Sequence, residues 1–418
     1  MGPHRRSRYI TGNLRQPMLR PRHRLTRGAL AAFLVVLAIF VAACSSGGST
    51  SGSAGSSSTG GSAAGSNPIV LGISVPLSGS VGSSCGPMNK AMVAWFNHVN
   101  ATGGVDGRQL KVDTRDDNYQ AAEAVTNTRA FVAEHAVAVT GQCGSIQPPA
   151  QMPILQSANI PYLFVFGSCD TCTSDSMYYN LMPDYGVQLA EEIPWVFQKN
   201  GKGSVVIMTS ATPGAAAITS NVADAVKKAG GSFLASYSTP PGTADMTPFV
   251  LKMKALHPDY VVLNMTPQDA AVVTKAMSAE NFAPTKNLVG SAAISQATYL
   301  SNVSASLQPK VIVTSDVLAP SAAGNTQCAS VLKAAGVDVS SVTLRGCGTA
   351  QVVVQALKDA KGGVASASIV SALQSWTNVK ASEVYPPISF TKTNHIGVSS
   401  LYLFGVKNGQ FVVIGQLG

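Results

Sequence analysis

The residues of this sequence best suited to chemistry are seven cysteines and a serine set between glycines. The segment GSSCG, from Gly82 to Gly86, matches G-x-S-x-G, a strand-to-helix turn that exposes a nucleophilic serine. Ser84 would be the nucleophile, and His395 follows it in the chain order that such a triad requires. No HGG-type segment that would supply an oxyanion hole is present, so a serine hydrolase using Ser84 is only a remote alternative.

The cysteines divide into Cys44, which ends an N-terminal apolar run, and six others. An even remainder of six favours disulfides in an oxidising compartment, although six cysteines allow fifteen pairings. Cys169 and Cys172 form the motif CDTC, which suits redox chemistry or half of a zinc site. No second C-x-x-C or histidine pair accompanies it in the sequence. A local structural disulfide is therefore favoured, and neither a metal nor another cofactor is expected.

The first 43 residues have the character of an export signal, with many arginines followed by the apolar run Ala29 to Val41. The run is too short to span a bilayer comfortably. Its end, VAAC, resembles the lipobox of bacterial lipoproteins, in which the cysteine is lipidated and becomes the new N-terminus. We expect a signal peptide over 1–43, lipidation of Cys44 and a flexible Gly/Ser-rich tether over 44–66. An ordinary cleavable signal peptide is the alternative, and Met18 is a second candidate start.

The net charge of +9 argues against a role in binding nucleic acid once its distribution is considered. Eight of the 29 basic residues are arginines that precede Cys44, in a stretch without any acidic residue. The rest of the chain carries 21 basic and 20 acidic residues, which is close to neutral. We therefore expect no nucleic-acid partner.

Ser84 and the six cysteines after Cys44 must be positioned by an α/β fold, because strand-like apolar runs alternate with amphipathic stretches from Asn67 onward. In a first series, strands are expected at 69–77, 109–117, 136–141 and 160–168, and helices at 86–99, 121–134 and 149–158. In a second series, strands are expected at 203–210, 231–238, 259–265 and 286–291, and helices at 214–229, 247–256 and 269–279. Each series is expected to form its own open sheet.

The remaining segments must join one series or the other. They comprise an apolar run at 310–317, helical stretches at 329–335, 351–360 and 366–376, and a hairpin over 401–415 that turns at Lys407-Asn408-Gly409. We expect a first lobe over 67–190 with part of 316–376. The second lobe is expected over 191–315 with part of 377–418.

Several segments, in order, carry a family resemblance. The most specific are IVLGISVPLSG, from Ile69, and FNHVNATGGVDGRQLKVDTRDD, which ends at Asp117. TGQCGSIQPPA, ANIPYLF, VKKAGGSF and MKALHPDYVVL follow. Together they resemble the type I periplasmic-binding-protein family, in particular the leucine/isoleucine/valine-binding branch of ABC-transporter solute-binding lipoproteins. The resemblance implies two lobes, each an open, mostly parallel sheet flanked by helices, with three crossover segments and a ligand cleft between the lobes.

The resemblance also implies which residues contact the ligand. The first ligand loop would be Ser83 to Gly86, and at Ser145 the family's serine holds a ligand carboxylate beside backbone N–H groups at a helix start. The implied ligand contacts are Ser84, Cys85, Cys143, Gly144, Ser145, Phe166, Ser168, Cys169, Pro213, Thr266 and Ala292. Cys143 and Cys85 would lie on neighbouring ligand loops, which implies a disulfide between them. The implied disulfides are Cys85–Cys143, Cys169–Cys172 and Cys328–Cys347.

Two departures from the family weaken the implied amino-acid site. The family's D-x-x-Y-G segment reads TSATPGAA here, with Pro213 and no tyrosine. Ser291 and Ala292 stand where an acidic residue would pair with the ligand ammonium. A buried ammonium without a carboxylate partner is costly. An ordinary α-amino acid is therefore not expected as the ligand, unless Asp269 or Asp316 substitutes.

The function implied by the resemblance is capture of a small molecule without catalysis. The ligand would be an amino-acid-like molecule, an amide or a short acid, delivered to an ABC importer when the two lobes close. The partners would be permease subunits with a separate ATPase, because the chain has no G-x-x-x-x-G-K-[ST] loop. The receptor would be a monomer, lipid-anchored on the extracytoplasmic face of the cell membrane. The same fold also serves receptors that report to a membrane signalling partner, and this alternative stays open.

Overall fold

The computed structural model describes residues 67–324 and 326–418. The predicted signal peptide, the lipidation site Cys44 and the tether lie outside this part of the chain. None of the helices in the described part combines the length and the apolar character that a membrane crossing requires.

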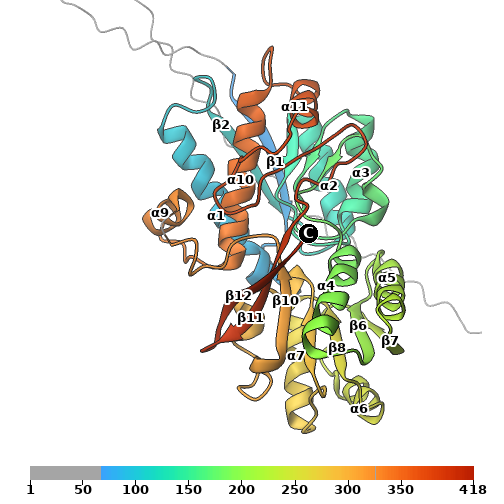
Figure 1. The fold of residues 1–418 in the computed structure, drawn as a ribbon. Coiled ribbons are helices and arrows are strands. Elements are labelled where there is room, and N and C mark those ends of the chain that lie inside the picture. The colour runs from blue at the N-terminus through green and yellow to red at the C-terminus, as the bar shows by residue number, and fades with distance from the viewer. Residues whose placement is uncertain (1–66, 325) are drawn as a thin grey trace, which may run out of the picture. The chain divides into compact units, whose positions relative to one another are not determined.

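Five parallel strands form the first sheet, in the order β2-β1-β3-β4-β5. Of these, β1 and β2 are labelled side by side in Figure 1. The strands are β1 (Ile69–Val75), β2 (Leu110–Asp116), β3 (Ala138–Thr140), β4 (Tyr162–Leu163) and β5 (Tyr178–Tyr179). They are connected by α1 (Gly82–Ala101), α2 (Ala121–Ala133) and α3 (Pro148–Ser157). Six of the seven β1 residues are buried, as expected of a central strand with both faces covered.

Two elements of this sheet differ from the prediction. The strand expected at 160–168 is reduced to Tyr162–Leu163, because the backbone of Phe164 turns to a φ of +59° and leaves the extended conformation. The helix expected from Gly86 starts at Gly82, so Ser83 to Gly86 form its first turns instead of a loop. Pro87, which usually favours the first turn of a helix, lies inside α1.

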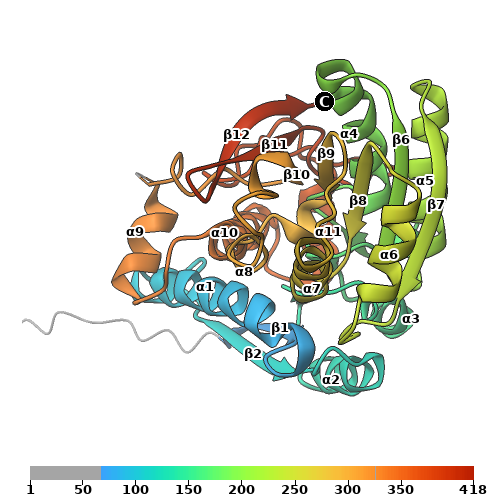
Figure 2. The same ribbon diagram turned by 90° about the horizontal axis from the view of Figure 1, so that it is seen from below.

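Seven strands form the second sheet, in the order β12-β11-β10-β9-β8-β6-β7, which follow one another in a curved row in Figure 2. Strands β6 to β10 are parallel, and β10, β11 and β12 pair antiparallel. The strands are β6 (Ser204–Ser210), β7 (Ser232–Thr239), β8 (Tyr260–Asn264), β9 (Asn287–Gly290), β10 (Val311–Ser315), β11 (Leu401–Lys407) and β12 (Gln410–Leu417). The predicted hairpin between β11 and β12 is confirmed, and Asn408 and Gly409 both have positive φ at its turn.

Helices cover both faces of the second sheet. The side chains of β6 point alternately to these two faces and therefore belong to two different apolar clusters. Val205 and Ile207 pack in the cluster that includes residues of α4 and α5, and Val206 and Met208 pack with α6 and α7. The helices are α4 (Tyr185–Asn200), α5 (Ala215–Lys228), α6 (Thr247–Ala255), α7 (Pro267–Ala279) and the single turn α8 (Ala297–Leu300). Helix α4, in a segment for which no helix was predicted, packs against α5.

The chain passes between the two sheets three times: between β5 and α4, between β10 and α9, and between α11 and β11. After the second passage, α9 (Gln327–Ala334), α10 (Ser341–Asp359) and α11 (Ser366–Gln374) return to the first sheet. Helix α10 crosses α1 so closely that a Cβ on Gly346 would lie 2.2 Å from the carbonyl oxygen of Met88. Only glycine allows this approach.

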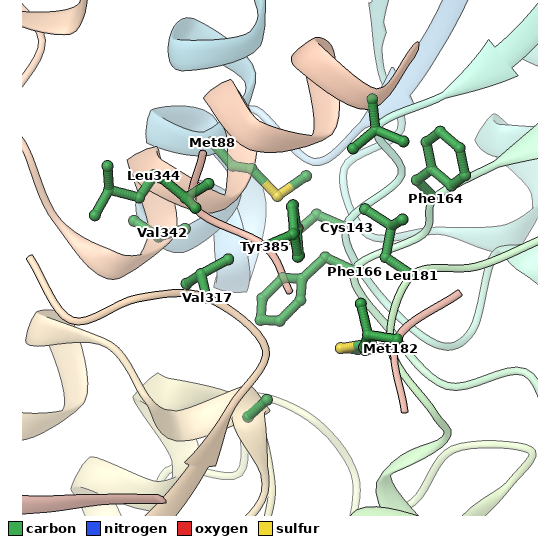
Figure 3. Packing of buried hydrophobic residues seen from close by; sticks show 14 of the residues in the cluster. Met88, Cys143, Phe164, Phe166, Leu181, Met182, Val317, Val342, Leu344 and Tyr385 are labelled. Carbon is green, nitrogen blue, oxygen red and sulfur yellow. The ribbon is translucent and has the colours of Figure 1, made fainter. Parts of the chain in front are cut away.

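The three crossover segments are hydrogen-bonded to one another. Asn180 of the first donates its backbone N–H to His395 O of the third over 2.9 Å, and Gly397 N–H donates to Asn180 O over 2.8 Å. Leu318 of the second donates to Val384 O of the third over 3.0 Å. Apolar side chains from the crossovers and from the first sheet, among them Val317, Tyr385 and Phe166, belong to one buried cluster here (Figure 3).

Candidate ligand-binding site

A cavity lies where the carboxyl ends of the strands of both sheets face each other. It offers about 520 Å³ of space free of protein atoms, including its opening to solvent. It is lined by Val81, Ser84, Cys85, Tyr119, Cys143, Gly144, Ser145, Phe166, Tyr185, Ser210, Thr212, Asn264, Met265, Thr266, Pro267, Ala293 and Gln296. Most of these residues end a strand or follow one closely, at the edge where open α/β sheets bind ligands. The lining suits a small organic molecule.

The structure brings seven of the eleven predicted contact residues together in the cavity wall: Ser84, Cys85, Cys143, Gly144, Ser145, Phe166 and Thr266. The other four do not line it. Ser168 Oγ and the Cys169 N–H both donate to Asp184 Oδ1 over 2.9 Å. Pro213 lines a separate surface hollow beside α5, and the N–H of Ala292 donates to Gln188 Oε1 over 3.1 Å.

The structure contains all three disulfides that were predicted. Cys85–Cys143 joins the first turn of α1 to the loop after β3, and both cysteines line the cavity. Cys169–Cys172 closes a short loop after β4. Cys328–Cys347 joins α9 to α10. The first of these bonds therefore fixes two walls of the cavity relative to each other.

A fully buried carboxylate, Asp117, supports the first-sheet side of the cavity from behind. It accepts hydrogen bonds from Ser74 Oγ (2.9 Å), from the side-chain amides of Gln142 and Gln147 (both 3.2 Å) and from the N–H of Tyr119 (3.0 Å). Burial raises the pKa of Asp117, although these hydrogen bonds act in the opposite direction. The network holds Tyr119 and the loop after β3 in one arrangement.

Ser145 and Tyr119 meet at the bend of that loop. Gly144 has a φ of +137°, and a Cβ there would lie 2.6 Å from the Tyr119 ring, so the position requires glycine. Ser145 Oγ accepts the N–H of Ser168 over 2.9 Å. Burial, with the carboxylates of Asp269 and Asp117 nearby, raises the pKa of Tyr119, so the phenol stays protonated.

The second-sheet side presents uncharged polar groups. Thr266 caps α7 by accepting the N–H of Asp269 over 3.2 Å, and Ser291 Oγ donates to Asn264 Oδ1 over 2.6 Å. Gln296 is 2% exposed, and its Nε2 donates to Ala293 O over 3.0 Å. Its Oε1 is buried and has no hydrogen-bond partner within the described part of the chain. An unpaired buried acceptor is costly, and a ligand donor would satisfy it.

Neither of the two acidic residues considered as partners for a ligand ammonium lines the cavity. Asp316 forms a buried ion pair with Arg345, with Nη2 to Oδ1 at 2.5 Å and Nε to Oδ1 at 2.9 Å. The Arg345 guanidinium lies over the Phe166 ring, 4.0 Å from its centroid. Asp269 is 2% exposed, accepts the N–H of Gly242 over 3.0 Å and does not line the cavity.

A polar bridge spans the cavity mouth. Gln268 Nε2, in the first turn of α7, donates to Ser84 Oγ over 2.8 Å and lies 2.9 Å from Ser83 Oγ. Helix α7 belongs to the second sheet, and α1, which carries both serines, belongs to the first. The structure therefore shows the two halves in contact across the mouth.

The structure does not assemble the triad that a serine hydrolase would need. Ser84 Oγ faces Gln268, whereas His395 stacks on Tyr179 with 4.4 Å between ring centroids. His395 Nδ1 lies 3.0 Å from the carbonyl oxygen of Asp175, and His395 does not line the cavity. Within residues 67–324 and 326–418, no group of three or more histidine, cysteine or acidic side chains is placed to hold a metal ion.

Six polar or aromatic lining residues were not among the predicted contacts: Tyr119, Tyr185, Ser210, Thr212, Asn264 and Gln296. Four of them carried a usable signal. Ser210 and Asn264 end β6 and β8, and Tyr119 and Thr212 follow strand ends closely, so all four stand where strands deliver residues to a cleft. Tyr185 and Gln296 follow no predicted strand directly and are brought in only by tertiary structure.

Comparison with known proteins agrees with this architecture. A family model described as "Periplasmic binding protein" matches residues 68–410. A substrate-binding periplasmic protein from Ralstonia solanacearum is similar in structure, with 20% identity, a TM-score of 0.73 and coverage of 82% of this chain and 99% of that one. A branched-chain amino acid ABC transporter protein from Thermus thermophilus with bound valine gives 14% identity, a TM-score of 0.76 and coverage of 84% and 96%.

A third similar structure is a fatty acid ABC transporter substrate-binding protein from Thermomonospora curvata, with 18% identity, a TM-score of 0.75 and coverage of 84% and 92%. At these identities the structures establish the fold. Comparison with curated protein sequences finds no match.

Proposed function

The chain belongs to the periplasmic binding protein family, and on this basis we propose that it is an extracytoplasmic receptor that delivers a small organic molecule to an ABC importer. The observation that carries the proposal is the cavity between facing strand ends, bridged at its mouth by Gln268 and Ser84. A molecule bound there contacts both halves at once and therefore stabilises the closed arrangement. Its release requires the halves to separate, as delivery to a permease demands.

Binding is tested by a thermal-shift screen of the purified chain against amino acids, amides, short acids and aromatic compounds, with mass spectrometry of any molecule that co-purifies. A ligand at a hundred times its Kd adds about 2.7 kcal/mol to the free energy of unfolding. Ala293→Phe, which fills the cavity, should abolish this shift. The matched control is Ala122→Phe on the exposed side of α2, which should preserve it. Equal shifts in both variants would place binding outside the cavity.

Delivery is tested in cells by uptake of the ligand that the screen identifies. Deletion of the gene should abolish uptake, and the wild-type chain but not Ala293→Phe should restore it. The alternative role, reporting ligand occupancy to a membrane signalling partner, predicts the opposite pattern: uptake persists and a ligand-induced response is lost.

We further propose that the receptor is a monomer anchored through lipid on Cys44, supported by the VAAC motif and the Gly/Ser-rich segment after it. Cys44→Ala should move the protein from the membrane fraction to the soluble fraction. If both forms fractionate alike, an ordinary cleavable signal peptide is the correct interpretation. Light scattering of the detergent-free Cys44→Ala form should report a single chain.

A further inference from the structure

The cavity wall contains no charged side chain. None of its seventeen lining residues is Asp, Glu, Lys, Arg or His. Asp316 and Asp269, the acidic residues considered as ammonium partners, do not line it; Asp316 pairs with Arg345, and Asp269 accepts the N–H of Gly242 with one oxygen. An ammonium group in this cavity would lose its hydration without gaining a carboxylate partner.

A ligand carboxylate would also find few partners at Ser145, the residue expected to hold it. Stable burial of a carboxylate needs several hydrogen-bond donors. The Oγ of Ser145 already accepts the N–H of Ser168, and no lysine or arginine lines the cavity. Ser145 therefore offers a carboxylate at most its hydroxyl proton and its backbone N–H, without a cationic partner.

One polar group of the cavity wall has no hydrogen-bond partner within the described part of the chain. Gln296 Oε1 is a buried acceptor without a partner in the described residues, and its Nε2 is committed to Ala293 O. The orientation of the amide is thereby set, with the oxygen left for a ligand N–H or O–H. Around it, Tyr119, Phe166 and Met265, together with the cavity disulfide, supply apolar surface.

From these observations we infer that the ligand is uncharged, with an apolar body and an amide or hydroxyl head that donates a hydrogen bond to Gln296. This inference rests on the proposed function and narrows it. A neutral head makes up for its lost hydration with one donor and one acceptor partner, whereas a charged head at the same place does not.

The test is a calorimetric comparison of molecules that share a body and differ in the head. The aromatic series is 2-phenylacetamide, phenylacetate, 2-phenylethylamine and L-phenylalanine; the aliphatic series is isovaleramide, isovalerate, isopentylamine and L-leucine. In at least one series the amide should bind tenfold or more tightly than each charged member. A charged member that binds as tightly as its amide overturns the inference, and so does a failure of all eight to bind.

Substitution of Gln296 tests the head group directly. Gln296→Leu leaves the ligand donor unpaired and should weaken amide binding by roughly tenfold or more, whereas Gln156→Leu, on the exposed side of α3, should not change it. Gln296→Glu supplies a carboxylate and should shift preference from the amide to the amine. Amide binding that is unchanged in Gln296→Leu, or a preference that does not shift in Gln296→Glu, overturns the inference.

The two proposals fail in different ways. Tight binding of L-leucine or L-phenylalanine would overturn the neutral-ligand inference and leave the receptor function intact. A chain that neither co-purifies with a small molecule nor responds to any compound of the broad screen would count against the receptor function itself.

Discussion

The side-chain amide of Gln268 lies 2.8 Å from the hydroxyl oxygen of Ser84, and this contact joins the first turn of α7 to the first turn of α1. Each of the two helices accompanies a different sheet. The contact therefore exists only while the cavity is closed.

The first prediction concerns this contact. Gln268→Ala removes a hydrogen bond of the closed arrangement, which contributes about 0.5–1.5 kcal/mol. Ligand affinity measured by calorimetry should fall by roughly two- to tenfold, because the open arrangement gains population. Gln156→Ala, on the exposed side of α3, is the control and should bind like the wild type. An unchanged affinity in Gln268→Ala would mean that the contact does not favour closure.

A second prediction ranks the three disulfides by the loops that they close. The two cysteines are 58 residues apart in sequence in Cys85–Cys143, 19 apart in Cys328–Cys347 and 3 apart in Cys169–Cys172. Loop-closure entropy then predicts losses of about 4, 3 and 2 kcal/mol in the free energy of unfolding when each pair is replaced by serines. Urea denaturation of the three double variants measures this. A different order would show that native-state packing outweighs chain entropy.

Only the Cys85–Cys143 replacement should also reduce ligand affinity, because that bond alone lies in the cavity wall. Equal affinity losses in all three double variants would contradict this expectation. They would point to a general loosening of the fold.

The third prediction concerns the buried pair of Arg345 and Asp316, whose side chains are 1% and 2% exposed. Asp316→Ala leaves an uncompensated buried guanidinium and should cost about 3–5 kcal/mol in urea denaturation. Replacing both residues with apolar ones, as Arg345→Met with Asp316→Leu, should recover most of that loss. Lys111→Ala breaks a surface pair with Glu134 whose lysine is 57% exposed, and should cost less than about 1 kcal/mol. A double variant as unstable as Asp316→Ala would contradict the argument.

The fourth prediction is a pH dependence that originates in α4. Glu192 is fully buried, and neither carboxyl oxygen has a partner in the described part of the chain. Burial raises the pKa of Glu192 well above its usual range. The unfolded chain releases this proton above about pH 4.3, whereas the folded chain retains it. The folded state then binds more protons, so the contribution of Glu192 to stability falls as the pH rises.

Glu192→Gln removes this dependence. The variant should be more stable than the wild type at pH 7 to 8, and the difference should vanish near pH 4, in thermal unfolding followed across pH. Asp224→Asn, an exposed carboxyl on the neighbouring helix α5, is the matched control and should show no such trend. A difference between wild type and Glu192→Gln that does not vary with pH would refute the assignment.

The strand and helix series were predictable because hydrophobic periodicity follows from burial, and the central strands are buried on both faces. Helix α4 was missed although Leu189, Ile193 and Val196 stand at helical spacing, because Pro194 interrupts the pattern. The start of α10 was placed ten residues too late, at Gln351. Its capping box, at Ser340, is completed by Thr343 instead of an acidic residue.

The cavity was predictable only in part, for a different physical reason. Cys85, Cys143 and Ser145 follow from a family pattern that is local in sequence, whereas Gln296 enters through a turn after β9 that no periodic signal describes. Asp316 was a candidate ligand partner in the sequence. Arg345, which pairs with Asp316, lies 29 residues further along the chain, and only the tertiary structure shows this ion pair.

The hydrogen bonds among the crossover segments limit how the molecule can move. Three independent connections would let the halves slide, twist or bend separately. Because Asn180 is bonded to the third crossover on both its N–H and its carbonyl oxygen, and Leu318 is bonded to that same crossover, all three must turn as one. In the proposed receptor, the bonded crossovers would act as one hinge between the halves. A permease that pulled on either half far from that hinge would gain leverage over the Gln268–Ser84 contact, and ligand release would become a mechanical response to docking.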